Sequence, residues 1–265
     1  MIFGTGLGPA NIAIASAPFP LTIGCTTVTI TPSSGSPVTA FLYYAVDGQV
    51  SGILPSNTPT GTANVTVTFN NATSAPAKIT VVKSDFGIFT LNQAGSGPGA
   101  ILNRNVDGTS PLNSLTSSAA PGQILELYGT GLGPISGTDN VAPGAVAPPG
   151  IDVKVLVAGQ AIIPLYAGRN PVYPGLDQID FQIAGDASVP DGCFVPIAVS
   201  VNGVVSNYAS FAKVTSGSTC PAPLGLSATA LQKLDKGGKV NVGTLSLSRS
   251  TVQATALGFS ISAAT

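Results

Sequence analysis

Residues 4–9 read Gly-Thr-Gly-Leu-Gly-Pro, and residues 129–134 repeat this motif without a change. An aromatic residue precedes each copy, Phe3 in the first and Tyr128 in the second. A repeat distance of about 125 residues is too long for a solenoid unit and suits whole domains in tandem. The duplicated motif therefore predicts two copies of one small domain.

Further landmarks follow both motifs in the same order. They are a Leu-Tyr pair, a glutamine, a turn and a serine: residues 42–43, 49, 70–71 and 74 in the first copy, and residues 165–166, 178, 202–203 and 206 in the second. Asn202-Gly203 between two apolar runs is typical of a type I′ hairpin, because both central residues must adopt positive φ. Gln49 and Gln178 recur at equivalent places, so we expect this glutamine to bond a loop backbone.

The composition favours many short strands over helices. Of the 265 residues, 44% are hydrophobic, which is enough for a core, but 8% are charged against roughly 25% in average proteins. Long amphipathic helices need Lys and Glu on their outer faces, whereas this chain is rich in glycine, proline and small polar residues. Such a mixture predicts an all-β fold whose strands are joined by Gly- and Pro-rich turns.

Alternating polar and apolar residues place the expected strands. In the first copy they cover residues 26–30, 38–46, 49–54, 63–69 and 77–82. In the connector they cover residues 87–91 and 100–103, and in the second copy residues 123–128, 152–157, 160–167, 178–183, 194–201 and 204–214. Near the C-terminus we expect a helix over residues 227–236, capped by Ser227, and a strand over residues 240–249.

The first copy lacks most of the strand that leads into the motif of the second copy. Residues 123–128 alternate as a strand before the second motif, whereas Met1, Ile2 and Phe3 alone precede the first. We therefore expect that the chain is a piece of a longer protein or that its start is misassigned. A sheet edge left unpaired there would invite association with another strand.

Charge and residue types exclude several classes of function. Ten basic and eleven acidic residues give a net charge of −1 without a basic cluster, which argues against nucleic-acid binding. The chain has no histidine, so Ser-His-Asp and Cys-His catalysis and His-ligated metals are excluded. No run of about 18 apolar residues occurs, so no membrane span is expected.

The glycine motif has two possible roles. A phosphate-binding loop would need a helix directly after the turn, whose N-terminus holds the pyrophosphate. Proline-containing stretches follow both motifs, at residues 10–20 and 135–149, so neither is expected to be helical. We therefore expect a structural turn, in which glycine allows positive φ and close backbone packing.

Cys193 and Cys220 flank the last two strands of the second copy. A disulfide between them would stabilise the fold by roughly 3–4 kcal/mol and would place the protein in an oxidising compartment. Two buried free thiols are the alternative. Cys25 is expected to be a buried small apolar residue or to pair with a partner upstream of this chain.

Polar and aromatic residues of the second copy are candidate ligand contacts. Gln178 and Asp180 lie on the polar face of an alternating strand, which could bind a sugar or a partner strand or could be an ordinary solvated face. Tyr166 and Tyr173, with Tyr43 and Tyr44 of the first copy, could form an aromatic platform for glycans, with ordinary packing as the alternative.

No catalytic, metal or cofactor site is predicted. Four aspartates, at positions 177, 180, 186 and 191, could be considered as calcium ligands. Their spacing matches no EF-hand loop, and calcium requires six to eight oxygen ligands. No Gly-x-Ser-x-Gly nucleophile motif occurs, and no pair of glycosidase carboxylates stands out.

The run that begins Ala120-Pro-Gly-Gln-Ile-Leu-Glu-Leu-Tyr and ends with the second motif resembles the opening of a repeat domain of exported acidobacterial proteins, the Solibacter-type domain. The resemblance extends over about residues 1–220 through residues 3–9, 42–45, 47–49, 87–89, 99–103, 107–109, 112–114, 153–159, 164–168, 175–183 and 203–207. This family is similar in outline to the IPT/TIG group of immunoglobulin-like folds. It implies β-sandwiches of extracellular or surface proteins and no known catalytic residues.

The strand pattern and the resemblance together predict two tandem Ig-like β-sandwiches, at residues 1–86 and 87–220, and a C-terminal segment at residues 221–265. The expected function is that of a spacer or adhesion module, not an enzyme, in a secreted or cell-surface bacterial protein. A carbohydrate-binding accessory module of a larger secreted protein is the alternative. Expected partners are surface proteins, glycans and adjacent domains of a longer parent chain.

Overall fold

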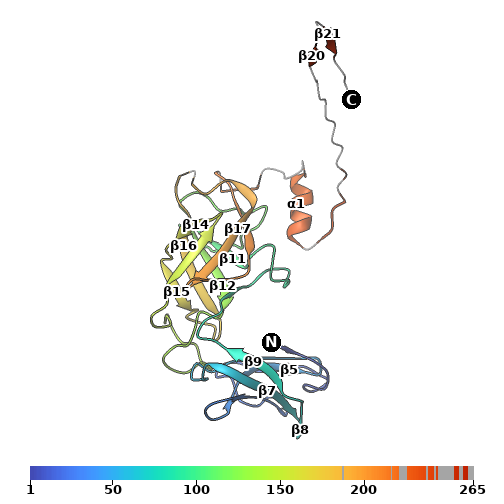
Figure 1. The fold of residues 1–265 in the computed structure, drawn as a ribbon, viewed down its shortest axis with the longest axis vertical. Coiled ribbons are helices and arrows are strands. Elements are labelled where there is room, and N and C mark those ends of the chain that lie inside the picture. Colours follow the sequence, from blue (N-terminus) through green and yellow to red (C-terminus); the bar gives the residue numbers. More distant parts are fainter. Residues whose placement is uncertain are drawn as a thin grey trace.

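The computed structural model describes residues 1–186, 188–215, 217–220, 226–236, 238–241, 243, 254–256 and 259–261. Within these residues strands dominate, and the one helix is α1 (Ala228–Asp235). The expected all-β class is therefore confirmed. Most strands form two pairs of antiparallel sheets, drawn in blue to teal and in green to orange in Figure 1.

The first unit consists of two sheets with the strand orders β1-β6-β5-β2 and β4-β3-β7-β8, and β9 also pairs with β7. Its strands are β1 (Ile2–Phe3), β2 (Ala13–Ile14), β3 (Thr26–Pro32), β4 (Val38–Thr39), β5 (Phe41–Val46), β6 (Gln49–Ile53), β7 (Gly61–Phe69), β8 (Ala72–Thr73) and β9 (Ala77–Val81). Val28, Leu42, Val50 and Val67 belong to the hydrophobic cluster of this unit.

The second unit has sheets with the strand orders β10-β12-β16-β15 and β14-β13-β17-β18, and β11 also pairs with β12 and β19 with β17. Its strands are β10 (Gly87–Ile88), β11 (Ile101–Arg104), β12 (Ile124–Thr130), β13 (Val153–Val157), β14 (Gln160–Ile162), β15 (Tyr166–Arg169), β16 (Asp177–Gln182), β17 (Gly192–Val201), β18 (Val204–Val205) and β19 (Ala209–Lys213). Leu125, Ile179, Phe181 and Ile197 belong to its hydrophobic cluster, which shares no residue with that of the first unit. Each unit is thus a β-sandwich with its own core.

The two units repeat the same strand order. The strands β1, β6 and β5 correspond to β12, β16 and β15, while β3, β7 and β9 correspond to β13, β17 and β19. The register repeats as well, since Phe3 lies opposite Gln49 and Tyr128 lies opposite Gln178. The sequence repeat therefore corresponds to a structural repeat, while the immunoglobulin-like family and the exact domain boundaries stay predictions.

Three of the expected strands are divided. Residues 38–46 form β4 and β5, residues 160–167 form β14 and the start of β15, and residues 204–214 contain β18 and β19. In the first two cases the chain crosses from one sheet of its unit to the other between the two pieces. The expected strand over residues 87–91 is limited to β10.

The expected C-terminal helix is present. Ser227 caps α1, because its Oγ accepts a hydrogen bond from Ala230 N at 3.2 Å. The expected strand over residues 240–249 lies largely outside the described residues, and positions 240, 241 and 243 are not in a strand. The short strands β20 (Ala254–Ala256) and β21 (Phe259–Ile261) pair with each other. Among the described residues, no helix has the length and apolarity that crossing a membrane requires.

Candidate functional site

A polar cluster lies on the outer face of the sheet that contains β11, β12, β16 and β15. Asp180 of β16 lies directly opposite Glu126 of β12 and Tyr166 of β15. Strand alternation explains this placement, since the neighbouring residue, Ile179, points into the core and is buried there. The structure thus brings together three of the expected ligand-contact residues, Tyr166, Gln178 and Asp180.

Side chains of the polar cluster bind one another. Arg104 Nε lies 3.2 Å from Glu126 Oε1, and Arg104 Nη1 lies 3.6 Å from Asp180 Oδ2. Gln178 Nε2 donates a hydrogen bond to Asp180 Oδ1 at 2.8 Å, and Tyr128 OH donates to Glu126 Oε2 at 3.0 Å. Glu126 is 7% exposed and Asp180 is 9% exposed, so this part of the polar row is not an ordinary solvated face.

Burial raises the pKa of Asp180 above its ordinary value, and the nearby Glu126 carboxylate raises it further. The hydrogen bond from Gln178 acts in the opposite direction and lowers this pKa. Burial also raises the pKa of Tyr128, together with its hydrogen bond to Glu126. Raised pKa values beside a second carboxylate are found in acid–base sites, but structural ion-pair networks perturb pKa values too. Because Arg104 and Gln178 already bind the carboxylates, the geometry supports a structural network across neighbouring strands.

Sequence reasoning missed Glu126 and Arg104 as members of this cluster. Both lie in strands distant from Asp180 in the sequence, and only the pairing of β11, β12 and β16 brings them together. The signal for Glu126 was nevertheless present, because it falls on the polar side of the alternating residues 123–128.

The two tyrosines expected to contact a ligand differ in exposure. Tyr166 is partly buried, and its OH donates a hydrogen bond to the carbonyl oxygen of Arg169. Tyr173 is 64% exposed, and its backbone N donates to Asn170 Oδ1 at 2.9 Å. Asn170 Nδ2 also donates to Gln178 Oε1 at 2.8 Å, which links the Tyr173 loop to the polar cluster. Of the two, Tyr173 offers the open aromatic surface.

Aspartates hold both glycine motifs. In the second unit Leu132 N donates to Asp177 Oδ2 at 2.8 Å, and Asp177 forms a buried ion pair with Arg169. In the first unit Gly6 N donates to Asp47 Oδ1 at 3.1 Å. Burial raises the pKa of Asp177, and the Arg169 guanidinium opposes this rise.

The glycine motif is a structural turn, as expected. Gly131 has a φ of 102°, and a β-carbon there would overlap the carbonyl oxygen of Asp85. No helix follows either motif, since residues 1–186 are all described and none of them is helical. The expectation that the shared glutamine bonds a loop backbone is wrong: Gln49 Nε2 donates to Met1 Sδ, and Gln178 bonds side chains.

Cys193 and Cys220 form the expected disulfide, with Cα atoms 5.6 Å apart. Cys25 is free and exposed, so the expectation of a buried small residue is wrong. Its φ of 59° belongs to a tight turn between Gly24 and β3, and this turn directs the chain so that the next residue, Thr26, is buried instead.

The four aspartates considered for calcium bind different partners. Asp177 pairs with Arg169, while Asp186 Oδ1 accepts from Ser188 N at 2.9 Å. Asp191 Oδ1 lies 2.8 Å from Lys213 Nζ. Among the described residues, no group of three acidic or cysteine side chains is placed to hold a metal ion.

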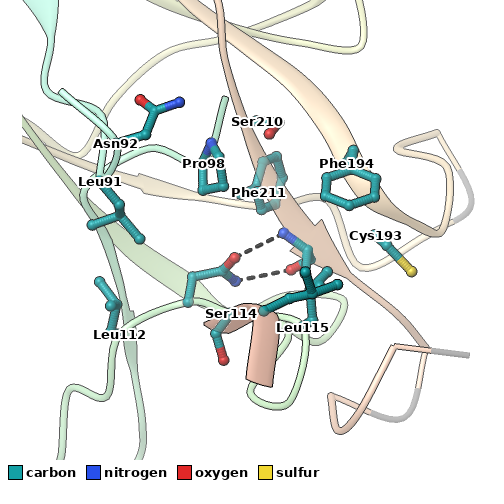
Figure 2. A pocket seen from close by; sticks show the side chains of 13 residues that line it. Leu91, Asn92, Pro98, Leu112, Ser114, Leu115, Cys193, Phe194, Ser210 and Phe211 are labelled. Carbon is teal, nitrogen blue, oxygen red and sulfur yellow. Dashed lines mark hydrogen bonds between the residues drawn. The ribbon is translucent and has the colours of Figure 1, made fainter. Parts of the chain in front are cut away.

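An apolar pocket of about 420 Å³ lies beside β19 (Figure 2). Its apolar lining includes Leu91, Leu112, Leu115, Phe194 and Phe211 and, from α1, Leu234. The side-chain amide of Asn113 also borders the pocket, but it binds the backbone: Oδ1 accepts from Ala212 N at 2.7 Å and Nδ2 donates to Ala212 O at 2.8 Å. Figure 2 shows both bonds as dashed lines. The pocket therefore offers mainly apolar contact, and the Asn113 amide is not available to orient a substrate.

Direct hydrogen bonds join the two units. Ser56 N and Oγ donate to the two carboxylate oxygens of Asp139, each at 2.7 Å. Phe19 N donates to Asn140 O at 2.8 Å, and Asn140 Nδ2 donates back to Phe19 O at 3.2 Å. Asp139 is 7% exposed, so these bonds are shielded from water. They give the two units a defined relative orientation.

Compared with models of known protein families, the chain matches none, and a search of curated proteins gives no significant match. The resemblance to the Solibacter-type domain therefore stays a prediction.

Proposed function

We propose that this chain is a non-catalytic structural module, a spacer or interaction unit of an exported bacterial protein. The observation that carries the proposal is that the glycine motif, the turn and the serine common to both units serve the fold in both. A binding or catalytic site retained by duplication would instead leave shared polar groups facing an open cavity.

The shared serines are the clearest case. Ser74 Oγ accepts from Val67 N at 3.1 Å, while Ser74 N donates to Val67 O at 2.8 Å. Ser206 forms the same two bonds with Val199, at 2.9 Å and 2.8 Å. Each serine thus closes the hairpin that follows β7 or β17. The shared turns also agree, since both of their residues have positive φ: Asn70, Asn71, Asn202 and Gly203.

Two further observations support the exported, spacer-like role. The Cys193–Cys220 disulfide is compatible with an oxidising compartment such as the cell exterior. The hydrogen bonds between Ser56 and Asp139 would keep the two units at a fixed separation, as a spacer requires. The resemblance to a repeat domain of exported proteins points the same way.

A spin-label distance measurement tests the spacer role. Cys25 is exposed and free, and Gln160→Cys adds a second exposed label in the other unit without reduction of the disulfide. We expect one narrow distance distribution, which Asp139→Ala broadens by removing the acceptor of both Ser56 bonds. Asp152→Ala is the matched control, since this exposed aspartate forms an ion pair with Lys154 of its own unit. A broad distance distribution in the doubly labelled chain that retains Asp139 would contradict the spacer proposal.

Carbohydrate binding is the second candidate, and the exposed Tyr173 beside the polar cluster favours it. This candidate predicts glycan-array binding that Tyr173→Ala abolishes, because a flat exposed ring can stack on a sugar. Tyr208→Ala is the control, since Tyr208 is 62% exposed and Tyr173 is 64% exposed. Absence of glycan binding, or equal loss with both variants, counts against carbohydrate recognition at Tyr173.

A further inference from the structure

The apolar pocket beside β19 is built from parts of the chain that lie far apart in the sequence (Figure 2). Residues 85–119, the strands β17 and β19 and the helix α1 all contribute to its lining. Their apolar side chains there are Leu91, Leu112, Leu115, Phe194, Phe211 and Leu234. The pocket is thus a product of the folded chain and not of one local segment.

The helix α1 forms one wall of the pocket. Leu234 lines it, and Leu231, which lies on the same face of the helix, is 1% exposed. The chain that leads to α1 is fixed to the lining at Cys220, which forms the disulfide with Cys193 and whose N donates to Leu115 O at 2.8 Å. The helix is therefore packed at the pocket and tethered to it.

Main-chain groups along the pocket already have partners inside the protein. Leu91 N donates to Pro98 O at 2.8 Å. The N and O atoms of Ala212 both bind the Asn113 amide, at 2.7 Å and 2.8 Å. An extended peptide in the pocket would find no free main-chain partner at these residues, and burying its own unpaired N–H and C=O groups would cost free energy.

Charge and volume narrow the choice of occupant further. None of the described residues that line the pocket is charged, and its polar members beside Asn113 are Asn92, Ser114 and Ser210. The volume is about 420 Å³, whereas an apolar cavity of about 150 Å³ is enough for one benzene ring. A single side chain of a partner protein would therefore fill only part of the pocket.

We propose that this pocket binds the hydrocarbon chain of a small amphiphile, a fatty alcohol or fatty acid, whose polar end stays in water. A hydrocarbon chain brings no polar group that needs a partner, and removal of its apolar surface from water supplies the affinity. Leu234 of α1 contacts the bound chain from one side. The inference goes beyond the proposed spacer role and does not depend on how the two units are oriented.

The experiment measures displacement of the neutral dye phenylnaphthylamine from the full chain by decanol, followed by dye fluorescence. We expect saturable binding of one dye per chain and full displacement by decanol. Decanediol with a hydroxyl at each end has the same chain but would bury one hydroxyl without a partner. It should displace the dye at least about tenfold more weakly than decanol does.

Substitutions in the lining locate the bound dye. Phe194 is 57% exposed, so Phe194→Ser removes apolar lining without opening the core and should weaken dye binding at least about tenfold. Phe3→Ser is the matched control, since Phe3 is 70% exposed and lies in the first unit. Leu234→Ser should also weaken binding, whereas Gln232→Ser, at an exposed position of the same helix, should not.

Sedimentation with phosphatidylcholine vesicles distinguishes two sources of the hydrocarbon chain. Vesicle binding that Phe194→Ser abolishes would assign the chain to a membrane lipid. Displacement by decanol without vesicle binding would assign it to a free amphiphile.

Several results would overturn the proposal. They are no saturable dye binding, equal displacement by decanol and decanediol, equal loss with Phe194→Ser and Phe3→Ser, and unchanged affinity in Leu234→Ser. The comparison of decanol with decanediol uses the unsubstituted chain, so misfolding of a variant cannot imitate it. A fall in bound dye per chain as the protein concentration rises would assign the pocket to an interface between copies and would make the ligand assignment wrong. The spin-label distance is unaffected by these results, so the two proposals can fail separately.

Discussion

At the scale of single residues, both units use polar side chains to bind backbone N–H groups at corresponding turns. Ser74 and Ser206 bind the same backbone groups of Val67 and Val199, and Asp47 and Asp177 each accept a backbone N–H of a glycine motif. The serines were recognisable from the sequence because they recur at fixed positions. The aspartates were not recognised as a pair, because they are not at equivalent positions. Asp47 lies one residue before the position in the first unit that corresponds to Asp177.

The serine bonds predict unequal losses of stability in the two units. Ser206 is partly buried and Ser74 is exposed, so water can replace the lost bond more easily at Ser74. We expect Ser206→Ala to lower the free energy of unfolding by about 1 kcal/mol and Ser74→Ala to lower it less. Urea unfolding followed by circular dichroism measures both changes. A larger loss at Ser74 would contradict this assignment.

Asp191 and the buried Lys213 predict a specific pH dependence. Lys213 is 2% exposed, and its Nζ donates to Val189 O at 2.7 Å and to Asp191 Oδ1 at 2.8 Å. The bonds from Lys213 and Thr215 lower the pKa of Asp191 to about 2. Because the pKa of Asp191 is lower in the folded state, its ionised carboxylate stabilises the fold at pH values above the unfolded-state pKa, near 4. This contribution disappears as the pH falls towards 2.

The Asp191→Asn variant isolates this contribution. We expect its Tm to lie below that of the unsubstituted chain at pH 5, and the difference to shrink between about pH 4 and pH 2. Thermal unfolding at a series of pH values measures the difference. Asp152→Asn serves as an exposed control, and parallel curves for Asp191→Asn and the unsubstituted chain would refute the role of the pair.

At the scale of elements, alternation predicted most strands but not the places where the chain changes sheet. Residues 160–167 read as one strand, yet β14 pairs with β13 and β15 pairs with β16 in the other sheet. Residues 38–46 divide in the same way. The crossing depends on partners far along the chain, and a local pattern carries no information about them. The polar cluster escaped prediction for the same reason, since Arg104, Glu126 and Asp180 meet only through strand pairing.

The disulfide predicts a loss of stability confined to the second unit. Cys193 and Cys220 are 27 residues apart, so replacing both by alanine should lower the free energy of unfolding by roughly 3–4 kcal/mol. Urea unfolding measures this loss, with Cys25→Ala as the control. Alkylation of the folded chain without reductant should add one label, at the exposed Cys25. Three labels would show that the bond is absent.

At the scale of the whole molecule, one scaffold is present twice, and within the described residues a covering segment, residues 85–119, lies on the second copy alone. The duplication and the all-β class were predictable because identical motifs and low charge are properties of the sequence itself. The incomplete first strand also predicted an unpaired edge near Phe3. The role of residues 85–119 in the core of the second unit could not be predicted, because it depends on their backbone bonds to Tyr128 and Ser210, far along the chain.

Amide hydrogen exchange of the full chain, followed residue by residue by NMR, tests this claim most directly. The account predicts that the amides of Phe3, Lys78 and Thr80 exchange at least about tenfold faster than those of the equivalent Tyr128, Ser210 and Ala212, because within the described part of the chain only the second set has hydrogen bonds outside the regular strand pairs. Ala63 and Val195, which lie at equivalent inner positions of β7 and β17, supply the internal comparison. Equal protection of the two sets of edge amides would mean that the first unit is closed as well, and would contradict the account.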